Sequence, residues 1–215
     1  MLQHGELGPP GRVGEWLRAR ELPFVIHRVW EAPLPDPTAF EFVISLGSEK
    51  SVTNDSPSWI PGEIDLLREA VDADVPVLGL CFGGQALSVA LGGGSDQLEQ
   101  PQIGWLPVKT SDALVPQGPW LHYHFELMRV PPGAREIARS AAGTAAFGFD
   151  RHLAIQFHPE VDPPMVERWV EVDPNLPPEI TPTRIAADSA THAPAARDQA
   201  FRMFDGWLDA AATER

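Results

Sequence analysis

The sequence predicts an α/β fold in a single domain, with a central, mostly parallel sheet that is flanked by helices. Short apolar runs rich in β-branched residues alternate with segments of helical period over the first ninety residues, which is typical of this class. The run at 75–80 is apolar throughout, as expected for a strand that is covered on both faces. A length of 215 residues suits one such domain and allows a large core.

The N-terminal half contains most of this alternation. Val13, Trp16 and Leu17 recur at helical spacing after a Pro-Pro-Gly turn and predict the first helix. The other elements expected in this half are strands at 22–30 and 40–46, a helix at 61–73, a strand at 75–80 and a helix that continues to Gly92.

The second half predicts a small mixed or antiparallel β extension. It contains four strand-like runs with little helix between them, at 103–108, 120–125, 144–149 and 152–158. A short helix at 166–172 and an amphipathic C-terminal helix at 195–212 follow, and we expect the latter to pack on the core. Within one domain of residues 1–215, the core is then expected at about 3–172, with a surface loop at 173–194.

Composition excludes several classes of function. Hydrophobic residues make up 43% of the chain and charged residues 21%, as in globular rather than disordered proteins. Thirty acidic against sixteen basic residues leave a net charge of -14, which disfavours nucleic acid and anionic membranes as partners. A single cysteine allows no internal disulfide, and no leader-like or membrane-spanning apolar run is present, so we expect a cytoplasmic protein.

The segment 79–85, Gly-Leu-Cys-Phe-Gly-Gly-Gln, is the most informative part of the chain. It follows the apolar strand directly and opens the next helix, where flanking glycines relieve the crowding of a sharp turn. Such a turn lifts the Cys81 sulfur into a cleft and places it near the positive end of a helix dipole, which favours the thiolate. Most lone cysteines are small buried hydrophobic residues, but the glycine pattern favours a nucleophile here.

A nucleophile of this kind needs a base and a group that orients the base. The run 153–161 predicts a strand that ends at His158-Pro159-Glu160. In extended backbone, residues two apart point to the same side, so the Glu160 carboxylate can reach the imidazole of His158. By themselves these two residues would be an ordinary strand-end histidine and a solvated glutamate.

Acyl transfer also requires donors for a developing oxyanion. A loop at 47–52 follows the strand at 40–46 and begins with Gly47, whose backbone N–H could turn inward. The N–H of Phe82, directly after the nucleophile, is the natural second donor. A glycine-containing loop of this length is more often only a connection between elements.

With these motifs the sequence resembles the class I (triad) glutamine amidotransferases, and in particular glutaminase domains of the GMP synthase type, over roughly residues 3–165. The markers are GLCFGGQ at 79–85, FHPEV at 157–161 and the glycine loop after the third strand. The resemblance implies this family's α/β fold and three groups of site residues. These are a catalytic triad of Cys81, His158 and Glu160, an oxyanion hole of Gly47 and Phe82, and a substrate site at Gln85, His124 and Phe125.

Two features depart from the family pattern. The first apolar strand is reduced to Leu2, Gln3 and His4, so either this strand is very short or the true start lies upstream. The oxyanion loop usually has a proline after its glycines, whereas here Glu49 and Lys50 occupy that stretch.

The resemblance implies a glutaminase that hydrolyses the γ-amide of L-glutamine through a cysteinyl thioester, without a metal or cofactor. The sequence has no P-loop and no G-x-G-x-x-G after a strand, so a separate synthase partner would use the ammonia. The same residues would also serve a γ-glutamyl amide or peptide hydrolase of this fold, and a regulatory subunit that has kept the fold is a third interpretation. His122 and His124 could chelate a metal, but without a supporting carboxylate or cysteine we expect satisfied polar histidines.

Overall fold

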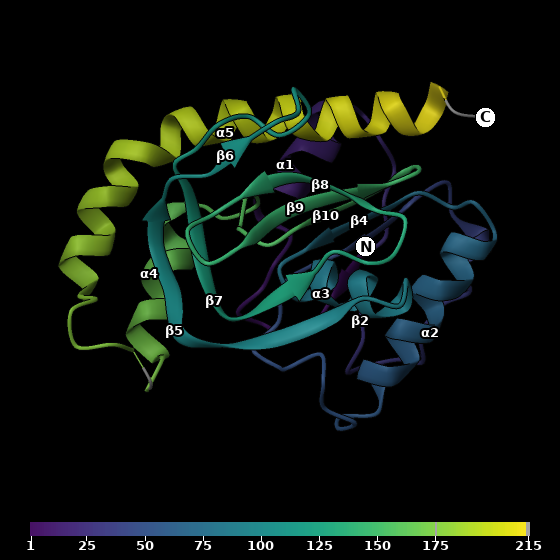
Figure 1. Cartoon of the computed structure of the whole chain (residues 1–215), viewed down its shortest axis with the longest axis horizontal. Coiled ribbons are helices and arrows are strands. Elements are labelled where there is room, and N and C mark those ends of the chain that lie inside the picture. Colours follow the sequence, from purple (N-terminus) through teal and green to yellow (C-terminus); the bar gives the residue numbers. More distant parts are fainter. Residues whose placement is uncertain (175, 214–215) are drawn as a thin grey trace.

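An eight-stranded sheet is the middle layer of the computed structural model, which describes residues 1–174 and 176–213 (Figure 1). Five strands run parallel, in the spatial order β2 (His27–Arg28), β1 (Leu2–Gln3), β3 (Val43–Ser45), β4 (Val77–Leu80) and β10 (His152–Ile155). Antiparallel strands continue it on the β10 side, in the order β9 (Thr144–Phe149), β8 (Arg135–Arg139) and β6 (Lys109–Thr110). The predicted fold class is therefore confirmed.

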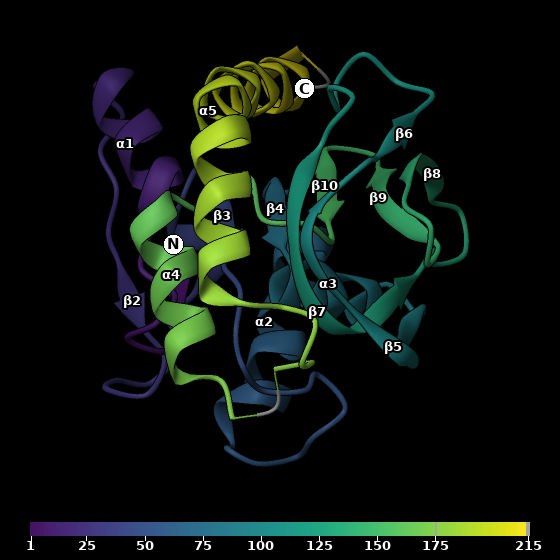
Figure 2. The same ribbon diagram turned by 90° about the vertical axis from the view of Figure 1, so that its left-hand side faces the viewer.

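Helices cover both faces of this sheet (Figure 2). Because side chains alternate along a strand, Ile44 and Leu78 join the core under α1 (Gly11–Ala19) and α5 (Pro182–Thr213). Val43 and Val77 point to the opposite face and join the core under α2 (Trp59–Asp72) and α3 (Phe82–Ala90). A short 3-10 helix, η1 (Pro37–Ala39), precedes β3.

The predicted β extension is a separate two-stranded antiparallel sheet. It pairs β5 (Gly94–Leu106) with β7 (Trp120–Arg129), and the register shifts between Gln97 and Gln102. A third apolar cluster under α4 (Pro163–Val172) contains Leu121 of β7, Met165 and Ile185, and so connects the extension to α4 and α5.

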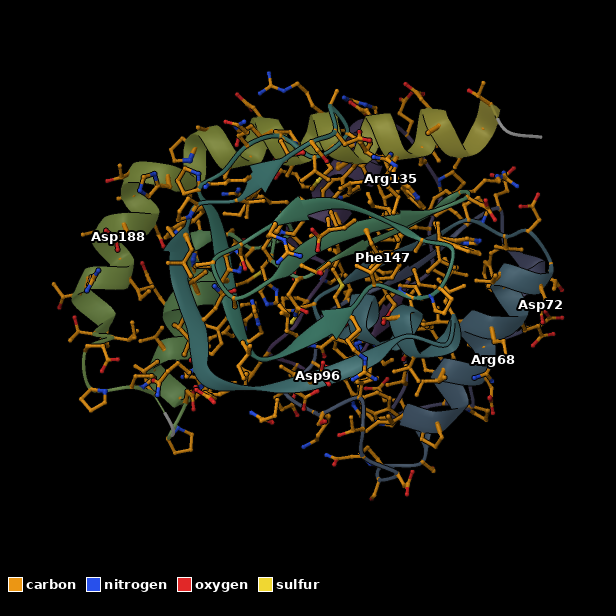
Figure 3. The ribbon with its side chains drawn as sticks, viewed as in Figure 1. Arg68, Asp72, Asp96, Arg135, Phe147 and Asp188 are labelled. Carbon is orange, nitrogen blue, oxygen red and sulfur yellow. The ribbon has the colours of Figure 1, made fainter. Side chains whose placement is uncertain are left out.

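Figure 3 labels charged side chains at the surface of the molecule and one apolar side chain in its core. Phe147 of β9 is fully buried near the middle of the molecule. Arg68, Asp72 and Asp188 lie on its outer surface, on helices that project their charged faces into solvent. No helix among the described residues is long and apolar enough to cross a membrane.

Several predicted boundaries were wrong. The strands expected at 22–30 and 40–46 shrink to His27–Arg28 and Val43–Ser45, because β1 is only two residues long and pairs with both. Conversely, the strand expected at 103–108 begins at Gly94, where mostly polar, solvent-facing residues hide the strand signal. The strands β6 and β8 were not predicted.

The loop expected at 173–194 ends early, because α5 begins at Pro182 and residues 182–194 are helical. This first part of α5 buries Ile185, Ser189 and Ala193 at four-residue spacing. Ser189 and Ala193 are too small or too polar to produce an apolar periodicity in the sequence. Pro194 is also a residue that usually marks a helix boundary. In the structure α5 passes through Pro194 and bends sharply along its length (Figures 1 and 2), as proline inside a helix causes.

Candidate active site

Cys81 lies at the turn between β4 and α3, in a backbone conformation that few residues adopt. Its φ of 51° and ψ of -106° are strained for a residue with a side chain, and it is the N-cap of α3. The turn is held by the Cys81 N–H, which donates to the Ile155 carbonyl at 2.7 Å. Gly83 allows the tight packing beneath it, because a Cβ at this position would lie 2.2 Å from the Ser45 carbonyl oxygen.

His158 and Glu160 form a buried pair just beyond β10. The Nδ1–H of His158 donates to the Glu160 carboxylate, with Nδ1 and Oε1 2.7 Å apart, and both side chains are at most 5% exposed. The strand ends at Ile155, three residues before the histidine, yet the predicted i, i+2 reach is present. A backbone bond from the His158 N–H to the Leu121 carbonyl, at 2.8 Å, fixes this segment against β7.

The Gly47 loop closes over the two side chains. A Cβ at Gly47 would lie 3.1 Å from Cε1 of His158 and 3.8 Å from the Cβ of Cys81. Gly47 therefore lies next to both Cys81 and His158, and a side chain at this position would crowd the imidazole. Phe82, the first residue of α3, turns its ring away into the core against Trp59, so only its backbone is available to this site.

A cavity of about 630 Å³ joins these groups. Among the residues that line it are Cys81, His158, Glu160, Gly47, Gln85, His124 and Phe125. Seven of the eight residues expected at the site thus share one cavity, and the eighth, Phe82, is adjacent to it through the chain. Cys81 is only 5% exposed but is one of the lining residues, so its sulfur is reached through the cavity rather than from the outer surface.

Charge in the cavity acts mainly on His158. Burial lowers the pKa of its imidazole, but the charge of a Cys81 thiolate and that of the Glu160 carboxylate outweigh burial. Hydrogen bonds to the same two residues add to this, and the pKa of His158 is raised well above its usual value. The imidazolium form of His158 is therefore favoured in this cavity.

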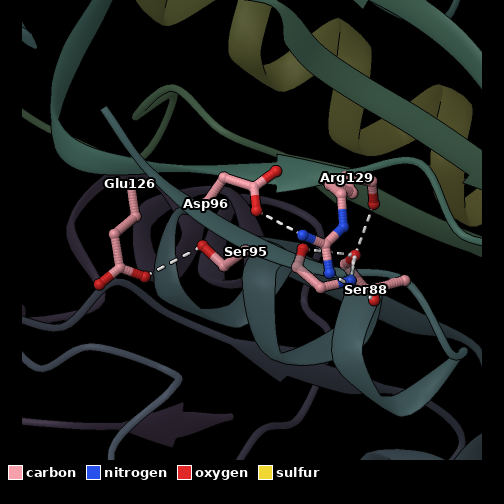
Figure 4. A network of polar contacts seen from close by, with 7 residues as sticks. Ser88, Ser95, Asp96, Glu126 and Arg129 are labelled. Atoms are coloured by element: carbon pink, nitrogen blue, oxygen red, sulfur yellow. Dashed lines mark hydrogen bonds and ion pairs between the residues drawn. The ribbon is translucent and has the colours of Figure 1, made fainter. Parts of the chain in front are cut away.

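The expected substrate-binding residues form another part of the cavity wall, on α3 and β7. Gln85 lines the cavity and its side-chain amide donates to the Glu126 carbonyl at 3.2 Å. Figure 4 shows how the nearby strands are tied down: Ser95 donates to the Glu126 carboxylate, and Ser88 donates to the Arg129 carbonyl. An ion pair between Arg129 and Asp96 joins β7 to β5. This wall is therefore held in place before any ligand arrives.

His122 and His124 are hydrogen-bonded to each other, but the expectation that both are satisfied is wrong for His122, whose Nε2 is buried without a partner among the described residues. Nδ1 of His124 lies 2.9 Å from the Glu126 carbonyl, which can only accept, so this nitrogen carries the proton. The other nitrogen of the neutral ring then accepts from Nδ1–H of His122 at 3.1 Å. Burial, with the charge of His158, lowers the pKa of His124 to about 3, and it lowers that of His122 well below its usual value. Among the described residues, no group of three or more His, Cys, Asp or Glu side chains is placed to hold a metal ion.

Three cavity neighbours escaped sequence reasoning. Gln156 places its amide nitrogen 3.9 Å from the Cys81 sulfur, and its amide oxygen accepts from the Met128 N–H at 2.9 Å. The Trp169 ring packs edge-on against His158, with centroids 4.9 Å apart. Tyr123 contributes its carbonyl oxygen, 3.4 Å from Nε2 of His158. Only Gln156 carried a signal, because it is a polar residue in an otherwise apolar run.

Comparison with protein families gives one match over more than half of the chain. The model described as "Glutamine amidotransferase class-I" matches residues 47–167, a range that includes Gly47, Cys81, His158 and Glu160.

Curated relatives carry the name "GMP synthase [glutamine-hydrolyzing]". That of Alkalilimnicola ehrlichii is 30% identical over 186 residues, which cover 74% of this chain and 34% of the relative. That of Mycobacterium bovis is 33% identical over 145 residues, which cover 62% of this chain and 28% of the relative. The chain spans about a quarter to a third of the length of the curated relatives it matches.

Solved structures match over almost the whole chain. A structure described as glutamine amido transferase from Methylobacillus flagellatus is 26% identical, with a TM-score of 0.88, and the match covers 97% of this chain and 93% of that one. A glutamine amidotransferase from Thermotoga maritima, 20% identical, has the same fold with a TM-score of 0.85 and covers 97% of this chain and 96% of that one.

Proposed function

The chain belongs to the class I glutamine amidotransferase family, and from that premise we propose that it is a cysteine-dependent glutaminase. It hydrolyses the γ-amide of L-glutamine to glutamate and ammonia. The observation that carries the proposal is the shared cavity, in which a strained Cys81 faces the buried pair of His158 and Glu160. Raised basicity of the imidazole beside the sulfur supports an ionised nucleophile.

In the first half-reaction the Cys81 thiolate attacks the γ-carbonyl carbon, and a C–S bond forms as the carbonyl oxygen becomes an oxyanion. Backbone N–H groups of Phe82 and of the Gly47 loop stabilise this charge. The protonated imidazole of His158 gives its proton to the amide nitrogen, the C–N bond breaks and ammonia leaves. Glu160 keeps the ring in position through Nδ1 throughout.

In the second half-reaction the thioester is hydrolysed. His158, now neutral, takes a proton from water, and the resulting hydroxide attacks the acyl carbon. The C–S bond breaks, glutamate is released, and the thiolate and imidazolium are restored. Gln85 binds the substrate glutamine, and His124 and Phe125 meet its α-amino and carboxylate end.

The ammonia is used by a separate synthase. The relatives named as glutamine-hydrolysing GMP synthases are three to four times longer than the part this chain matches, and their names join glutamine hydrolysis to synthesis. A partner that supplies the acceptor site would complete the same pairing. The nucleophilic cysteine must remain reduced to act, and thiols are kept reduced in the cytoplasm. We therefore expect the reaction to take place there.

The direct test is ammonia release from L-glutamine by the wild type and by Cys81→Ala, with thermal unfolding to confirm that the variant is folded. We expect loss of activity by about 10⁶-fold, since removal of a nucleophile in a triad has an effect of that order. A folded variant that retains activity would falsify the proposal. Cys81 is the only cysteine in the sequence. A glutamine-mimicking electrophile should therefore increase the mass of the wild type by that of one label molecule, and it should leave the mass of the variant unchanged.

The size of the cavity favours a second candidate, a γ-glutamyl amide or peptide hydrolase. A volume of about 630 Å³ lies in the range of pockets that hold drug-sized ligands, which leaves room for a leaving group larger than ammonia. Comparison of kcat/KM for glutamine and for γ-glutamyl amides, each with and without a candidate synthase, separates the two. Preference for the larger amides in the absence of any partner identifies the second activity.

A further inference from the structure

The peptide between Ile155 and Gln156, at the end of β10, is hydrogen-bonded through both of its polar groups. Its carbonyl accepts from the Cys81 N–H at 2.7 Å, and its N–H donates to the Ala145 carbonyl at 2.9 Å. The Gln156 side chain therefore starts from backbone that is bonded to the turn carrying the sulfur. This side chain is completely buried, so its amide group needs partners within the protein.

A main-chain donor fixes the orientation of the Gln156 amide. Its Oε1 accepts from the Met128 N–H of β7 at 2.9 Å. A backbone N–H can only donate, so the carbonyl oxygen of the amide, and not its NH2 group, faces Met128. The NH2 group is the other branch of the amide, and Nε2 lies 3.9 Å from Sγ of Cys81. Gln156 thus bridges β7 and the nucleophile.

The contact with the sulfur has a defined polarity. An amide NH2 group can donate hydrogen bonds but cannot accept them. Hydrogen bonds to an ionised group are roughly twice as strong as those between neutral groups, so this donor stabilises a thiolate more than a thiol. Gln156 therefore shifts the equilibrium of the Cys81 sulfur toward the thiolate.

The Gln156 amide differs from His158 because it keeps its protons throughout the proposed reaction. His158 gives its proton to the leaving ammonia and later takes one from water, so the charge that it places beside the sulfur changes during the cycle. The amide is neutral at every step, and its donor is present both when the thiolate attacks and when the C–S bond breaks. It therefore stabilises the sulfur as nucleophile and again as leaving group.

We propose that Gln156 is a positioning residue for the nucleophile: its side-chain NH2 group donates to the Cys81 sulfur and favours the thiolate, while its carbonyl is anchored on Met128 of β7. The inference rests on the proposed glutaminase activity and adds a group to the triad of Cys81, His158 and Glu160. No bond is made or broken at Gln156, which acts only through the sulfur.

Gln156→Met tests the donor, with Gln102→Met as its matched control. Methionine has a similar length and no donor, and Gln102 is also buried but accepts from the Ser140 hydroxyl at 2.9 Å. Because Cys81 is the only cysteine, the ultraviolet absorbance of the thiolate, taken as the difference from the same protein with Cys81→Ala, titrates one sulfur. We expect the ratio of thiolate to thiol at a given pH to fall about 10-fold in Gln156→Met and to stay unchanged in Gln102→Met. An unchanged ratio in a folded Gln156→Met protein, or equal falls in both variants, overturns the inference.

A second replacement separates the donor from the anchor on Met128. The methyl-ketone analogue of Gln156 has a methyl group in place of the NH2 group and keeps the carbonyl that accepts from the Met128 N–H. A purely structural role through Met128 predicts the wild-type ratio of thiolate to thiol in this analogue, whereas the inference predicts the same fall as in Gln156→Met. The wild-type ratio overturns the inference, even where Gln156→Met fails to fold.

The pH profile of glutamine hydrolysis links the donor to catalysis. The acid limb of kcat/KM reports ionisation in the free enzyme. We expect this limb to move to higher pH in the analogue by as much as the thiolate titration does, whereas lost packing would lower the rate equally at every pH. A limb that stays in place overturns the role in catalysis. The thiolate titration needs no substrate, so it decides the inference separately, and ammonia release by wild type against Cys81→Ala decides the proposed function.

Discussion

The Cys81 N–H donates to the Ile155 carbonyl at 2.7 Å, so the turn that carries the sulfur is bonded to the last residue of the strand that leads to His158. The strands β4 and β10 are adjacent and parallel, with Leu80 in register with Ile155. Their carboxyl ends therefore lie at the same edge of the sheet. The turn at Cys81 and the segment that leads to His158, about seventy residues apart in sequence, are thus held together at the same edge of the sheet.

Removal of the sulfur should lower the pKa of His158. The pKa is raised although burial opposes it, and the charge of Cys81 is the first of the interactions that raise it. Cys81→Ala leaves burial unopposed by that charge. Titration of the histidine ring protons by NMR, in wild type and variant, measures the change, and an unchanged or higher pKa in the variant would contradict the proposed ion pair.

The same shift predicts how stability depends on pH. The folded-state pKa of His158 lies above its usual 6.5, so its interactions stabilise the fold fully below pH 6.5 and are lost as pH rises through the folded-state pKa. The free energy of unfolding of wild type relative to Glu160→Gln, measured in urea, should therefore decrease as pH rises across that interval, because Glu160 is one of the two charges that raise this pKa. A difference that grows with pH has the wrong sign.

Substitution of Glu160 should reduce activity less than loss of the sulfur. Glu160→Gln keeps the shape but removes the charge that orients and stabilises the imidazolium, and kcat should fall on the order of 10²- to 10⁴-fold. Glu171→Gln is the control, because that carboxylate is 68% exposed and pairs with Arg168 at the surface. Steady-state ammonia release checks both, and equal activities would remove Glu160 from the triad.

Gly83 should tolerate no larger residue. A Cβ there would lie 2.2 Å from the Ser45 carbonyl oxygen, so Gly83→Ala must displace backbone and should destabilise the fold by about 3 kcal/mol or more. Gly148→Ala is the matched control, since a Cβ there meets nothing within 4 Å. Urea unfolding compares them, and similar stabilities would show that the turn yields easily.

The second part of α5 should carry much of the stability of the α1 face. Trp207 is 2% exposed, and its indole N–H donates to the Arg151 carbonyl at 3.2 Å. Trp207→Ala should lower the free energy of unfolding by about 3–5 kcal/mol, whereas Trp30→Ala, at a side chain 40% exposed, should have a much smaller effect. Equal effects would mean that α5 is only loosely attached.

Some of the site could be expected from residue order alone. Segment 79–85 contains the apolar strand end, the glycines and the helix start, all of which are local, so the turn at Cys81 follows from it. The reach from His158 to Glu160 is equally local, being two residues of extended chain. In contrast, Gln156 and Trp169 approach the same cavity by packing of β10 and α4, and no local pattern indicates where such side chains point.

By itself, the sequence determined the fold class. It also led to the proposal of Cys81, His158 and Glu160 as nucleophile, base and orienting carboxylate, because each motif depends on spacing within a few residues. It did not determine the short strands β1 and β2, the early start of α5 or the direction of the peptide at Gly47. Strand length depends on the partner available for pairing, and the Gly47 carbonyl turns toward a histidine forty-three residues away. Only tertiary packing brings such partners together. The lengths of β1 and β2 and the orientation of the Gly47 carbonyl are therefore decided in the folded chain.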